Sequence, residues 1–326
     1  MKNLDVLKTQ EAIKQIKDYF QIALAKKLKL YRFSSPLIVA SNKGLNDDLT
    51  GNESPLKFTS KVNGVKAEVV HSLAKWKRLK IYEHNISLYR GIYTDMNAIR
   101  TDEILDETHS IYVDQWDWEL RIKPEDRSIK FLKQIVNKIY QVLVQTQKWV
   151  IQKYGTKQDV SLPEKIHFIS SQELLDLYPN FDSKQRENMI AKKYGAVFIM
   201  QIGHKLSNKQ PHDFRSPDYD DWNLNGDIIV YNPKSKQALE LSSMGIRVDA
   251  STLKNQLKLA NCESRQNLEF HQQLLTNQLF QTIGGGIGQS RLCYFLLQKA
   301  HIGEVQSSVW TDAIYQECKK KKINLL

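Results

Sequence analysis

Two long stretches of the chain repeat apolar residues at the spacing of an amphipathic helix. In residues 5–30, Ile13, Ile16 and Phe20 recur at intervals of three and four, with lysines between them. Residues 126–154 keep the same period. An apolar stripe of this kind is typical of a helix that packs against a core. We expect shorter helices from His71, near Gln289, and over residues 170–178, 183–194, 250–260 and 265–276.

Residues 110–119 alternate as a β-strand does, because successive side chains of a strand point to opposite faces. One face would carry Ile111, Val113, Gln115 and Asp117, and the other Tyr112, Asp114, Trp116 and Trp118. Buried amide and carboxylate groups need partners, so a ligand or a hydrogen-bond network should meet Gln115 and Asp117. We interpret the two tryptophans as core or interface residues.

Apolar runs bounded by turn-forming residues predict the remaining strands. Asn63-Gly64 is a strong two-residue turn signal and predicts a hairpin over residues 57–70. Glu240 and Ser242 should share one face of their strand. Strands that cluster with hairpins, rather than alternating regularly with helices, favour one α+β domain over residues 1–326. The other predicted strands span residues 37–40, 165–169, 195–203, 227–231 and 237–248, and all of them except 165–169 are expected to be buried.

Residues 281–291 read Gln-Thr-Ile-Gly-Gly-Gly-Ile-Gly-Gln-Ser-Arg and hold four of the chain's 14 glycines. Closely spaced glycines let the backbone approach a ligand or another strand. The dipole of the helix that follows favours anions in its first turn, where Arg291 stands. The stretch therefore has two interpretations: a site for an anionic or planar ligand, or a glycine-rich turn that enters a core helix.

Two polar loops carry paired charges. Residues 44–51 include Asp47 and Asp48, but Asn, Asp and Gly form turns readily, so this loop alone predicts a turn. Residues 213–225 include Arg215 and Asp220 and lie between two predicted core strands. A charged insert in that position is a surface loop or a ligand lid.

Composition indicates a globular protein, with 41% hydrophobic and 25% charged residues among 326. No apolar run approaches the roughly 20 residues that span a bilayer. The first residues also lack an apolar secretory segment. Cys262, Cys293 and Cys318 show neither metal-ligand spacing nor an even disulfide framework. We therefore expect a cytoplasmic protein with no membrane partner.

The net charge of +11 raises the possibility of a nucleic-acid surface. The lysines, however, are spread between apolar positions of the predicted helices, and the dense run at residues 319–322 lies at the end of the chain. This distribution favours ordinary solvated faces, and we expect no nucleic-acid partner. An anionic small substrate such as ATP would also benefit from the positive field.

The nucleotide-binding signals differ from the common ones. No glycine run is followed by Gly-Lys-Ser/Thr, and no dinucleotide fingerprint opens the chain. Residues 286–291 instead match Gly-x-Gly-x-x-Arg, and residues 240–243 join an acid to two serines. With Arg100 and Asp227, these motifs resemble the ATP-binding core of class II aminoacyl-tRNA synthetases of the aspartyl and asparaginyl type. The resemblance implies a mainly antiparallel sheet flanked by helices.

Longer runs resemble one family of relatives, the ammonia-dependent asparagine synthetases (aspartate–ammonia ligases). These runs cover residues 69–78, 112–119, 217–222, 240–249 and 282–291, with residues 46–51 as an N-terminal active-site loop. The resemblance extends over nearly the whole chain. It implies that ATP activates L-aspartate as β-aspartyl-AMP with release of pyrophosphate, and that ammonia then gives L-asparagine and AMP. It also implies Mg²⁺ as cofactor and a homodimer.

The same resemblance assigns the site residues to three groups. Asp47, helped by Gln115, should bind ammonium and take up a proton in the second step. Arg100 and Arg291 should act on the phosphate and the adenine, Arg215 and Asp220 should close over the nucleotide from their loop, and Asp227 and Glu240 should hold the metal. The nucleotide site would comprise Arg100, Arg215, Asp220, Asp227, Glu240, Gly286, Gly288 and Arg291. The aspartate site would comprise Ser72, Lys77, Gln115, Asp117, Ser242, Ser243 and Arg247.

Other functions fit the sequence less well. A synthetase-like enzyme that transfers an activated amino acid to tRNA or protein is disfavoured, because the catalytic pattern starts soon after the first helix and leaves no anticodon-binding domain. An inactive binding paralogue is disfavoured, because every charged position expected in the site is present. A glutamine-using synthetase is disfavoured, because no cysteine follows Met1. We interpret His71 as structural.

Overall fold

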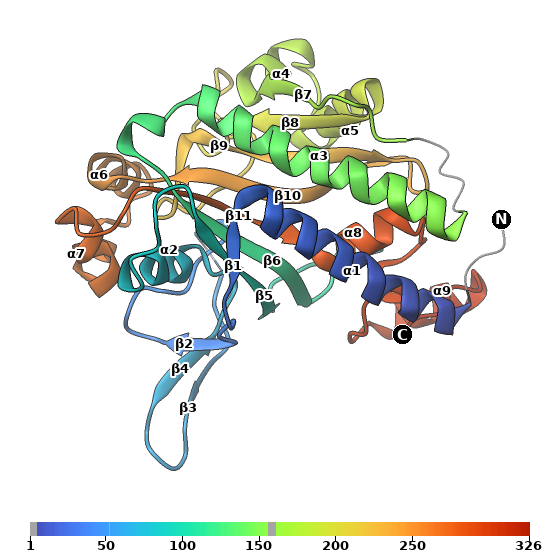
Figure 1. Ribbon diagram of the computed structural model, residues 1–326, viewed down its shortest axis with the longest axis horizontal. Helices are drawn as coiled ribbons and strands as arrows, with labels where there is room; N and C mark the ends of the chain where they lie inside the picture. The colour runs from blue at the N-terminus through green and yellow to red at the C-terminus, as the bar shows by residue number, and fades with distance from the viewer. Residues whose placement is uncertain (1–4, 52, 156–160) are drawn as a thin grey trace.

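Helices α1 (Val6–Leu28) and α3 (Ile129–Tyr154) form a layer across one face of a β-sheet. The computed structural model describes residues 5–51, 53–155 and 161–326. The Asp5 carboxylate caps α1, and the Ser128 hydroxyl accepts a hydrogen bond from the first turn of α3. The two helices lie side by side (Figure 1). Both bury their apolar stripes, so the two long-helix predictions are confirmed.

Within the described residues, eight strands form the main sheet in the order β1-β5-β6-β11-β10-β9-β8-β7. The central pairs are antiparallel, whereas β1 pairs with β5 and β7 with β8 in parallel at the two edges. The predicted α+β fold with a mainly antiparallel sheet is therefore confirmed. The strands are β1 (Leu30–Arg32), β5 (Gly91–Ile99), β6 (Tyr112–Arg121), β7 (His167–Ser170), β8 (Ala196–Met200), β9 (Asp220–Asn232), β10 (Gln237–Arg247) and β11 (Thr282–Gly288).

A small second sheet projects away from the main sheet (Figure 1). It has the order β2-β4-β3, with β2 (Ile38–Ala40), β3 (Lys57–Thr59) and β4 (Lys66–Val69). The predicted hairpin is confirmed, and Gly64 supplies the positive φ of +69° that its turn needs. The strand over residues 37–40 was expected to be buried, but only its central residue, Val39, is.

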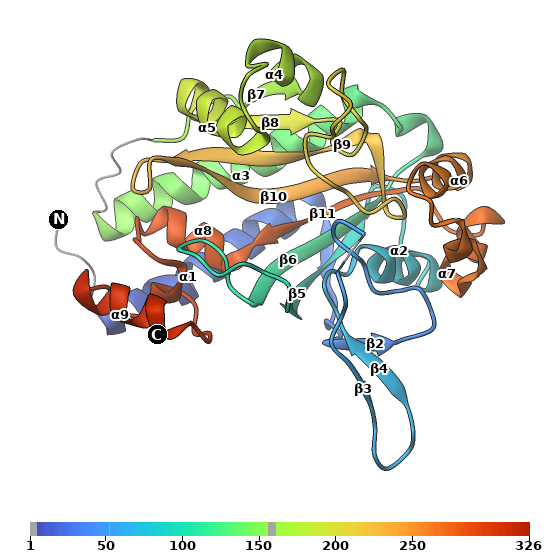
Figure 2. The same ribbon diagram turned by 180° about the vertical axis from the view of Figure 1, so that it is seen from behind.

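The other face of the main sheet is covered at its two ends (Figure 2). Helix α5 (Ser183–Tyr194) packs on β8, β9 and β10, and α4 (Ser171–Leu177) packs on β7. Helix α2 (Ala74–Glu83) packs against β5, β6 and β11, and an apolar cluster joins it to α6 (Ala250–Leu259) and α7 (Glu269–Leu275). The remaining helices are α8 (Gln289–Leu296), α9 (Asp312–Lys320), and the 3-10 segments η1 (Pro124–Asp126), η2 (Glu263–Asn267) and η3 (Ile302–Glu304). None of the helices in the described ranges is long and apolar enough to cross a membrane.

Several predicted boundaries were wrong. The loop over residues 213–225 ends at Tyr219, because β9 begins at Asp220 and pairs with Arg247 of β10. The helix over residues 265–276 is divided into η2 and α7. Helix α2 begins at Ala74 rather than His71, and the first predicted helix ends at Leu28, because Leu30, its last predicted residue, begins the edge strand β1.

Candidate active site

A cavity of about 290 Å³ lies on the sheet face opposite α1 and α3, because Gln115 and Asp117 of β6 line it while Trp116 packs against Phe20 of α1. Strands β6, β10 and β11 form its floor, and its walls come from the start of α2 and from residues 100–114 and 213–220. It therefore gathers segments that are far apart in the sequence. The predicted site residues that line it are Ser72, Lys77, Arg100, Gln115, Asp117, Arg215, Asp220, Glu240, Ser243, Arg247, Gly286, Gly288 and Arg291.

The alternation of β6 separates the core from the cavity. Trp116 and Trp118 are fully buried, and Trp116 packs against Phe20 of α1 with ring centroids 4.7 Å apart. Their interpretation as core residues is confirmed. Gln115 and Asp117 point the other way and line the cavity. The neighbouring strand is glycine-rich because these side chains occupy the space above it: a Cβ on Gly286 would lie 2.4 Å from Gln115 Oε1 and 2.7 Å from Asp117 Oδ1.

Lys77 and Asp117 form a buried ion pair at one end of the cavity. The Nζ of Lys77 lies 3.3 Å from Asp117 Oδ2 and donates to the carbonyl oxygen of Gly285. The same carboxylate oxygen accepts a hydrogen bond from Leu73 N, one residue before α2. Burial lowers the pKa of the Lys77 ammonium, and Asp117 and Glu119 oppose that effect. The fold thus holds a lysine in a fixed position against the floor of the cavity.

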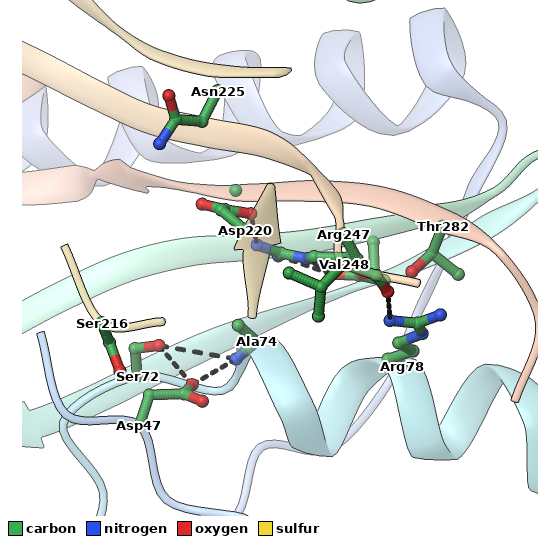
Figure 3. Close-up of polar contacts among 12 residues, drawn as sticks. Asp47, Ser72, Ala74, Arg78, Ser216, Asp220, Asn225, Arg247, Val248 and Thr282 are labelled. Carbon is green, nitrogen blue, oxygen red and sulfur yellow. Dashed lines mark hydrogen bonds and ion pairs between the residues drawn. The ribbon is translucent and has the colours of Figure 1, made fainter. Parts of the chain in front are cut away.

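Arg247 joins two further carboxylates next to this pair. Its guanidinium lies 2.7 Å from Glu119 Oε2 and 2.5 Å from Asp220 Oδ1, and Figure 3 shows Arg247 extended toward Asp220. Burial alone would lower the pKa of Arg247, but Glu119 and Asp220 raise it well above its usual range. Arg247 is therefore a permanently charged and oriented group in the cavity wall. A Cβ on Gly284 would lie 2.0 Å from Glu119 Oε2, so only glycine leaves room for this arrangement.

The opposite end of the cavity combines arginines with carboxylates. Arg215 contacts Asp227 and lies 2.7 Å from Asp213. Burial raises the pKa of the Asp227 carboxyl to about 7, with Arg215 opposing the rise and Glu240 adding to it. Burial acts in the same direction on Glu240, but Arg291 and Arg215 outweigh it and lower its pKa. The two carboxyls therefore differ, and Asp227 holds a proton more readily than Glu240 does.

Two more arginines reach this end from different elements. Arg291, in the first turn of α8, donates to the carbonyl oxygen of Glu240 at 3.3 Å and lies 3.7 Å from its carboxylate. Arg100, which follows β5, donates through Nη2 to the carbonyl oxygen of His71. Within the described residues its Nε is buried and has no hydrogen-bond partner. Burial lowers the pKa of Arg100. Such arginines are suited to an anionic ligand that supplies the missing acceptors.

Comparison of the sequence with known proteins shows the family to which the chain belongs. Residues 7–322 match the family model for aspartate–ammonia ligase. The chain is 61% identical over 327 residues to the aspartate–ammonia ligase of Mycoplasmoides gallisepticum, covering 100% of both chains, and 57% identical to that of Malacoplasma penetrans with the same coverage. It is 54% identical to the Fusobacterium nucleatum ligase, covering 99% of this chain and 98% of the other.

The chain belongs to the aspartate–ammonia ligase family. The predicted family and activity are thereby confirmed: the protein is a ligase of asparagine biosynthesis that amidates aspartate with ammonia.

Solved structures share this fold. The asparaginyl-tRNA synthetase of Entamoeba histolytica, solved with asparaginyl-adenylate, superposes with a TM-score of 0.66 at 13% identity, covering 92% of this chain and 66% of the other. The Pyrococcus horikoshii asparaginyl-tRNA synthetase, also solved with asparaginyl-adenylate, gives 0.62 at 14% identity, covering 91% and 68%. The ligase thus has the catalytic fold of class II synthetases, as predicted.

Three of the predicted site residues lie just outside the lining of the cavity. Asp47 is fully buried behind Ser72 and Ala74, to which it is hydrogen-bonded. Asp227 does not line the cavity but contacts Arg215, which does. The expected common face of Glu240 and Ser242 was wrong, because a bulge after Glu240 shifts the register of β10 against β9. Ser242 consequently donates to the carbonyl oxygen of Gly286, and Ser243 lines the cavity.

Asp220 takes a different position from the one expected. It was predicted to close over the nucleotide with Arg215 from a loop. It is instead the first residue of β9 and binds Arg247 at the Lys77 end of the cavity. The buried ionisable residues that sequence reasoning missed include Glu119, Lys75, Asp218 and His271. For Glu119 a signal existed, since it continues the strand face of Gln115 and Asp117.

Proposed function

We propose that the ligase works in two steps within this one cavity, as a single catalytic domain over residues 1–326. In the first step, an oxygen of the β-carboxylate of aspartate attacks the α-phosphorus of ATP, and pyrophosphate leaves. In the second step, the nitrogen of ammonia attacks the acyl carbon, AMP leaves with the bridging oxygen, and the nitrogen loses a proton. The observation that supports this scheme is the division of the cavity into two ends, one with fixed ion pairs that suits aspartate and one with arginines that suits ATP.

The end with the fixed ion pairs suits the substrate aspartate. The Lys77 ammonium and the Arg247 guanidinium can each bind a carboxylate, and Asp117 can accept from the α-ammonium group. Ser72, Gln115 and Ser243 add neutral hydrogen-bonding groups in the same lining, with Ser242 behind them. Because the charged groups are already paired, their desolvation is complete before substrate arrives.

The end with the arginines suits ATP. Arg100 would hold the α-phosphate, where charge increases in the transition state, and Arg291 would lie against the adenine. Arg215 would move from Asp227 and Asp213 toward the phosphates, with Asp220 fixed at the far side. The glycines at 286 and 288 leave the floor low enough for the reacting groups to meet.

Magnesium fits the carboxylates at this end. Among the described residues, no group of three or more His, Cys, Asp or Glu side chains is arranged as a protein-only metal site. Asp227, however, has a buried Oδ1 that accepts no hydrogen bond from the described residues, and the charge of Glu240 lies near enough to raise the pKa of Asp227. Mg²⁺ is commonly held by one or two carboxylates together with substrate phosphates. Asp227 and Glu240 would hold it here, and bound Mg²⁺ would neutralise phosphate charge.

In the second step Asp47 would take up the proton of the attacking nitrogen, and Gln115 would orient that nitrogen.

We further propose that the enzyme is a cytoplasmic homodimer. Support for a dimer comes from a set of exposed apolar side chains on β1, the small sheet and its hairpin: Tyr31, Leu37, Ile38, Leu56, Phe58, Val62 and Val65. Sedimentation of the purified chain would test the dimer.

One pair of assays tests the reaction order. Aspartate-dependent exchange of labelled pyrophosphate into ATP reports the first step, and formation of asparagine and AMP with ammonia, glutamine or tRNA reports the acceptor. We expect exchange without ammonia, and product with ammonia. Activity only with tRNA, or no exchange in an enzyme that makes asparagine, would contradict the proposal. Arg100→Met should abolish exchange, whereas Arg90→Met, at an exposed arginine just before β5, should not.

A further inference from the structure

A group of ionisable residues, all buried except the partly exposed Arg265, lies directly behind the cavity wall formed by Ser72 and Ala74. We call it the Asp47 cluster; its members are Asp47, Lys75, Asp218, Arg265 and His271. It joins the N-terminal loop, the start of α2, the segment before β9, and η2 with α7. Among these residues only Asp47 belongs to the two-step scheme above.

Asp47 is hydrogen-bonded to the cavity wall through one oxygen only. Its Oδ2 accepts from the Ser72 hydroxyl at 2.5 Å and from the backbone N–H of Ala74 at 2.6 Å (Figure 3). Its Oδ1 is buried and accepts no hydrogen bond within the described residues, and the nearest cation is the Nζ of Lys75 at 3.7 Å. Because the carboxylate is 0% exposed, a proton can reach it from the cavity only through a neighbouring group. Ser72, which lines the cavity, is that group.

Lys75 is held mainly by a different carboxylate. Its Nζ donates to Asp218 Oδ2 at 3.1 Å. The same oxygen contacts His271 Nε2 at 2.9 Å and Arg265 Nη1 at 3.2 Å, and Asp218 Oδ1 accepts from the Ser216 hydroxyl. If Asp47 loses its charge, Lys75 therefore remains paired with Asp218. The cluster can accept a proton at Asp47 without leaving a buried cation unpaired.

We propose that the proton released in the ammonia step passes through Ser72 to Asp47, and that Lys75 is a positioning residue which keeps Asp47 ionised and ready to accept it. The proposal rests on the two-step function above and deepens its second step. An N–H bond of the attached nitrogen breaks as an O–H bond forms at Ser72 Oγ. The original hydroxyl proton of Ser72 moves to Asp47 Oδ2 at the same time, so Ser72 is unchanged and Asp47 becomes neutral.

The groups that surround Asp47 set its proton affinity. Lys75 and Ala74 face it from the start of α2, Asp218 and Tyr219 from the segment before β9, and Ser72 from the turn before α2. Behind Asp218 stand Arg265 and His271, from η2 and α7. Burial raises the pKa of Asp47, and Lys75 and Ser72 counteract the rise while Asp218 adds to it. Removal of the Lys75 charge must therefore raise that pKa further.

The test separates the two steps in the intact enzyme. Lys75→Met is assayed by pyrophosphate exchange and, separately, by asparagine formation from preformed adenylate at a constant concentration of free NH₃ over the pH range. We expect exchange at the wild-type rate, an ammonia step slowed at least about tenfold at neutral pH, and an acid limb of the pH profile displaced upward by about one unit or more. Lys75→Arg should restore most of the rate. Lys80→Met, at a partly exposed lysine of the same helix, is the matched control and should change neither step.

A double variant distinguishes positioning from a general structural effect. If Lys75 acts through Asp47, Lys75→Met combined with Asp47→Asn should be no slower than Asp47→Asn alone, which we expect to slow the ammonia step by about 10² to 10⁴. Multiplicative losses, or an undisplaced acid limb, would overturn the proposal. Should Lys75→Met fail to fold, Ser72→Ala decides: an unchanged ratio of ammonia step to exchange overturns the relay, and a ratio lowered at least tenfold supports it. Absence of exchange in the wild type would instead refute the two-step function.

Discussion

Gly284 offers the sharpest test of why the floor of the cavity is built from glycine. Its backbone does not have a positive φ, so conformational freedom is not the reason for glycine at this position. A Cβ placed there would lie 2.0 Å from Glu119 Oε2, 2.6 Å from Glu119 Cδ and 2.5 Å from Arg247 Nη2. In Gly284→Ala, the carboxylate oxygen would have to move by about 1.4 Å to reach the 3.4 Å of an ordinary contact.

The magnitude follows from what holds that carboxylate. Glu119 is fully buried and makes its contacts of 2.7 to 3.2 Å with Arg247 through both oxygens. A displacement of about 1.4 Å breaks the pair, and separating a buried ion pair costs about 3 to 5 kcal/mol. We expect Gly284→Ala to lower the free energy of unfolding by that amount. Arg247 would also lose its orientation, so the KM for aspartate should rise.

Glu119→Asp provides the matched second change. Shortening the side chain by one methylene retracts the carboxylate by about 1.5 Å, close to the space that the new methyl group needs. Alone it should cost about 1 to 3 kcal/mol, because it lengthens the contacts with Arg247. In the double variant the two costs should be less than additive by about 1 to 3 kcal/mol. Urea unfolding of all four proteins measures this coupling, and strictly additive losses would refute the steric explanation.

Three further predictions address other parts of the molecule. Gly286→Ala should raise the KM for aspartate at least about tenfold, because its Cβ would meet Gln115 and Asp117 in the cavity itself. It should also lower the free energy of unfolding, because Asp117 is ion-paired with the buried Lys77; steady-state kinetics and thermal unfolding check both parts. Burial would raise the pKa of Glu53, but hydrogen bonds from Thr50 and Leu49 lower it, so the ionised carboxylate stabilises this loop fully above the usual carboxyl pKa and loses that effect as pH falls through the lowered pKa. Amide hydrogen exchange at Leu49 and Thr50, measured against pH, should show this loss, and in Glu53→Gln both amides should exchange fast at every pH. Burial raises the pKa of the Cys293 thiol to about 12, so it should stay unlabelled by iodoacetamide in the folded enzyme and react only on unfolding, as peptide mass analysis would show.

Local periodicity was sufficient to predict the parts of the fold that depend on one face of one element. The alternation of β6 correctly assigned Trp116 to the core and Gln115 to the cavity, since a period of two admits only two faces. The apolar stripes of α1 and α3 were equally readable. The parallel edge pairs and the bulge after Glu240 were not, because each depends on how two strands align rather than on the pattern of either one.

The buried ion clusters were the main omission on the site. By their spacing alone, Lys75 and Lys77 resemble the solvated lysines of any helix, and their partners Asp218 and Asp117 are far away along the chain. The family resemblance predicted Lys77 and Asp117 as site residues, but not as an ion pair. One local signal was present. The first turn of α2 contains basic residues and no acidic one, which opposes the helix dipole unless buried carboxylates compensate. In the structure they do so, and both lysines are almost fully buried.

The two ends of the cavity are suited to different tasks because their buried charges are paired to different extents. Around the Lys77 end, the buried charges balance, with three cations and three anions: Lys77, Arg78 and Arg247 against Asp117, Glu119 and Asp220. Most are held in ion pairs, so they are already desolvated and oriented in the folded protein, and this end can select its substrate by geometry. At the other end Arg100 and Arg291 are only partly buried, and the carboxyl of Asp227 has a pKa of about 7. In the proposed scheme, that end would change its contacts as the phosphates of ATP bind and pyrophosphate leaves, which a fully paired cluster could not do.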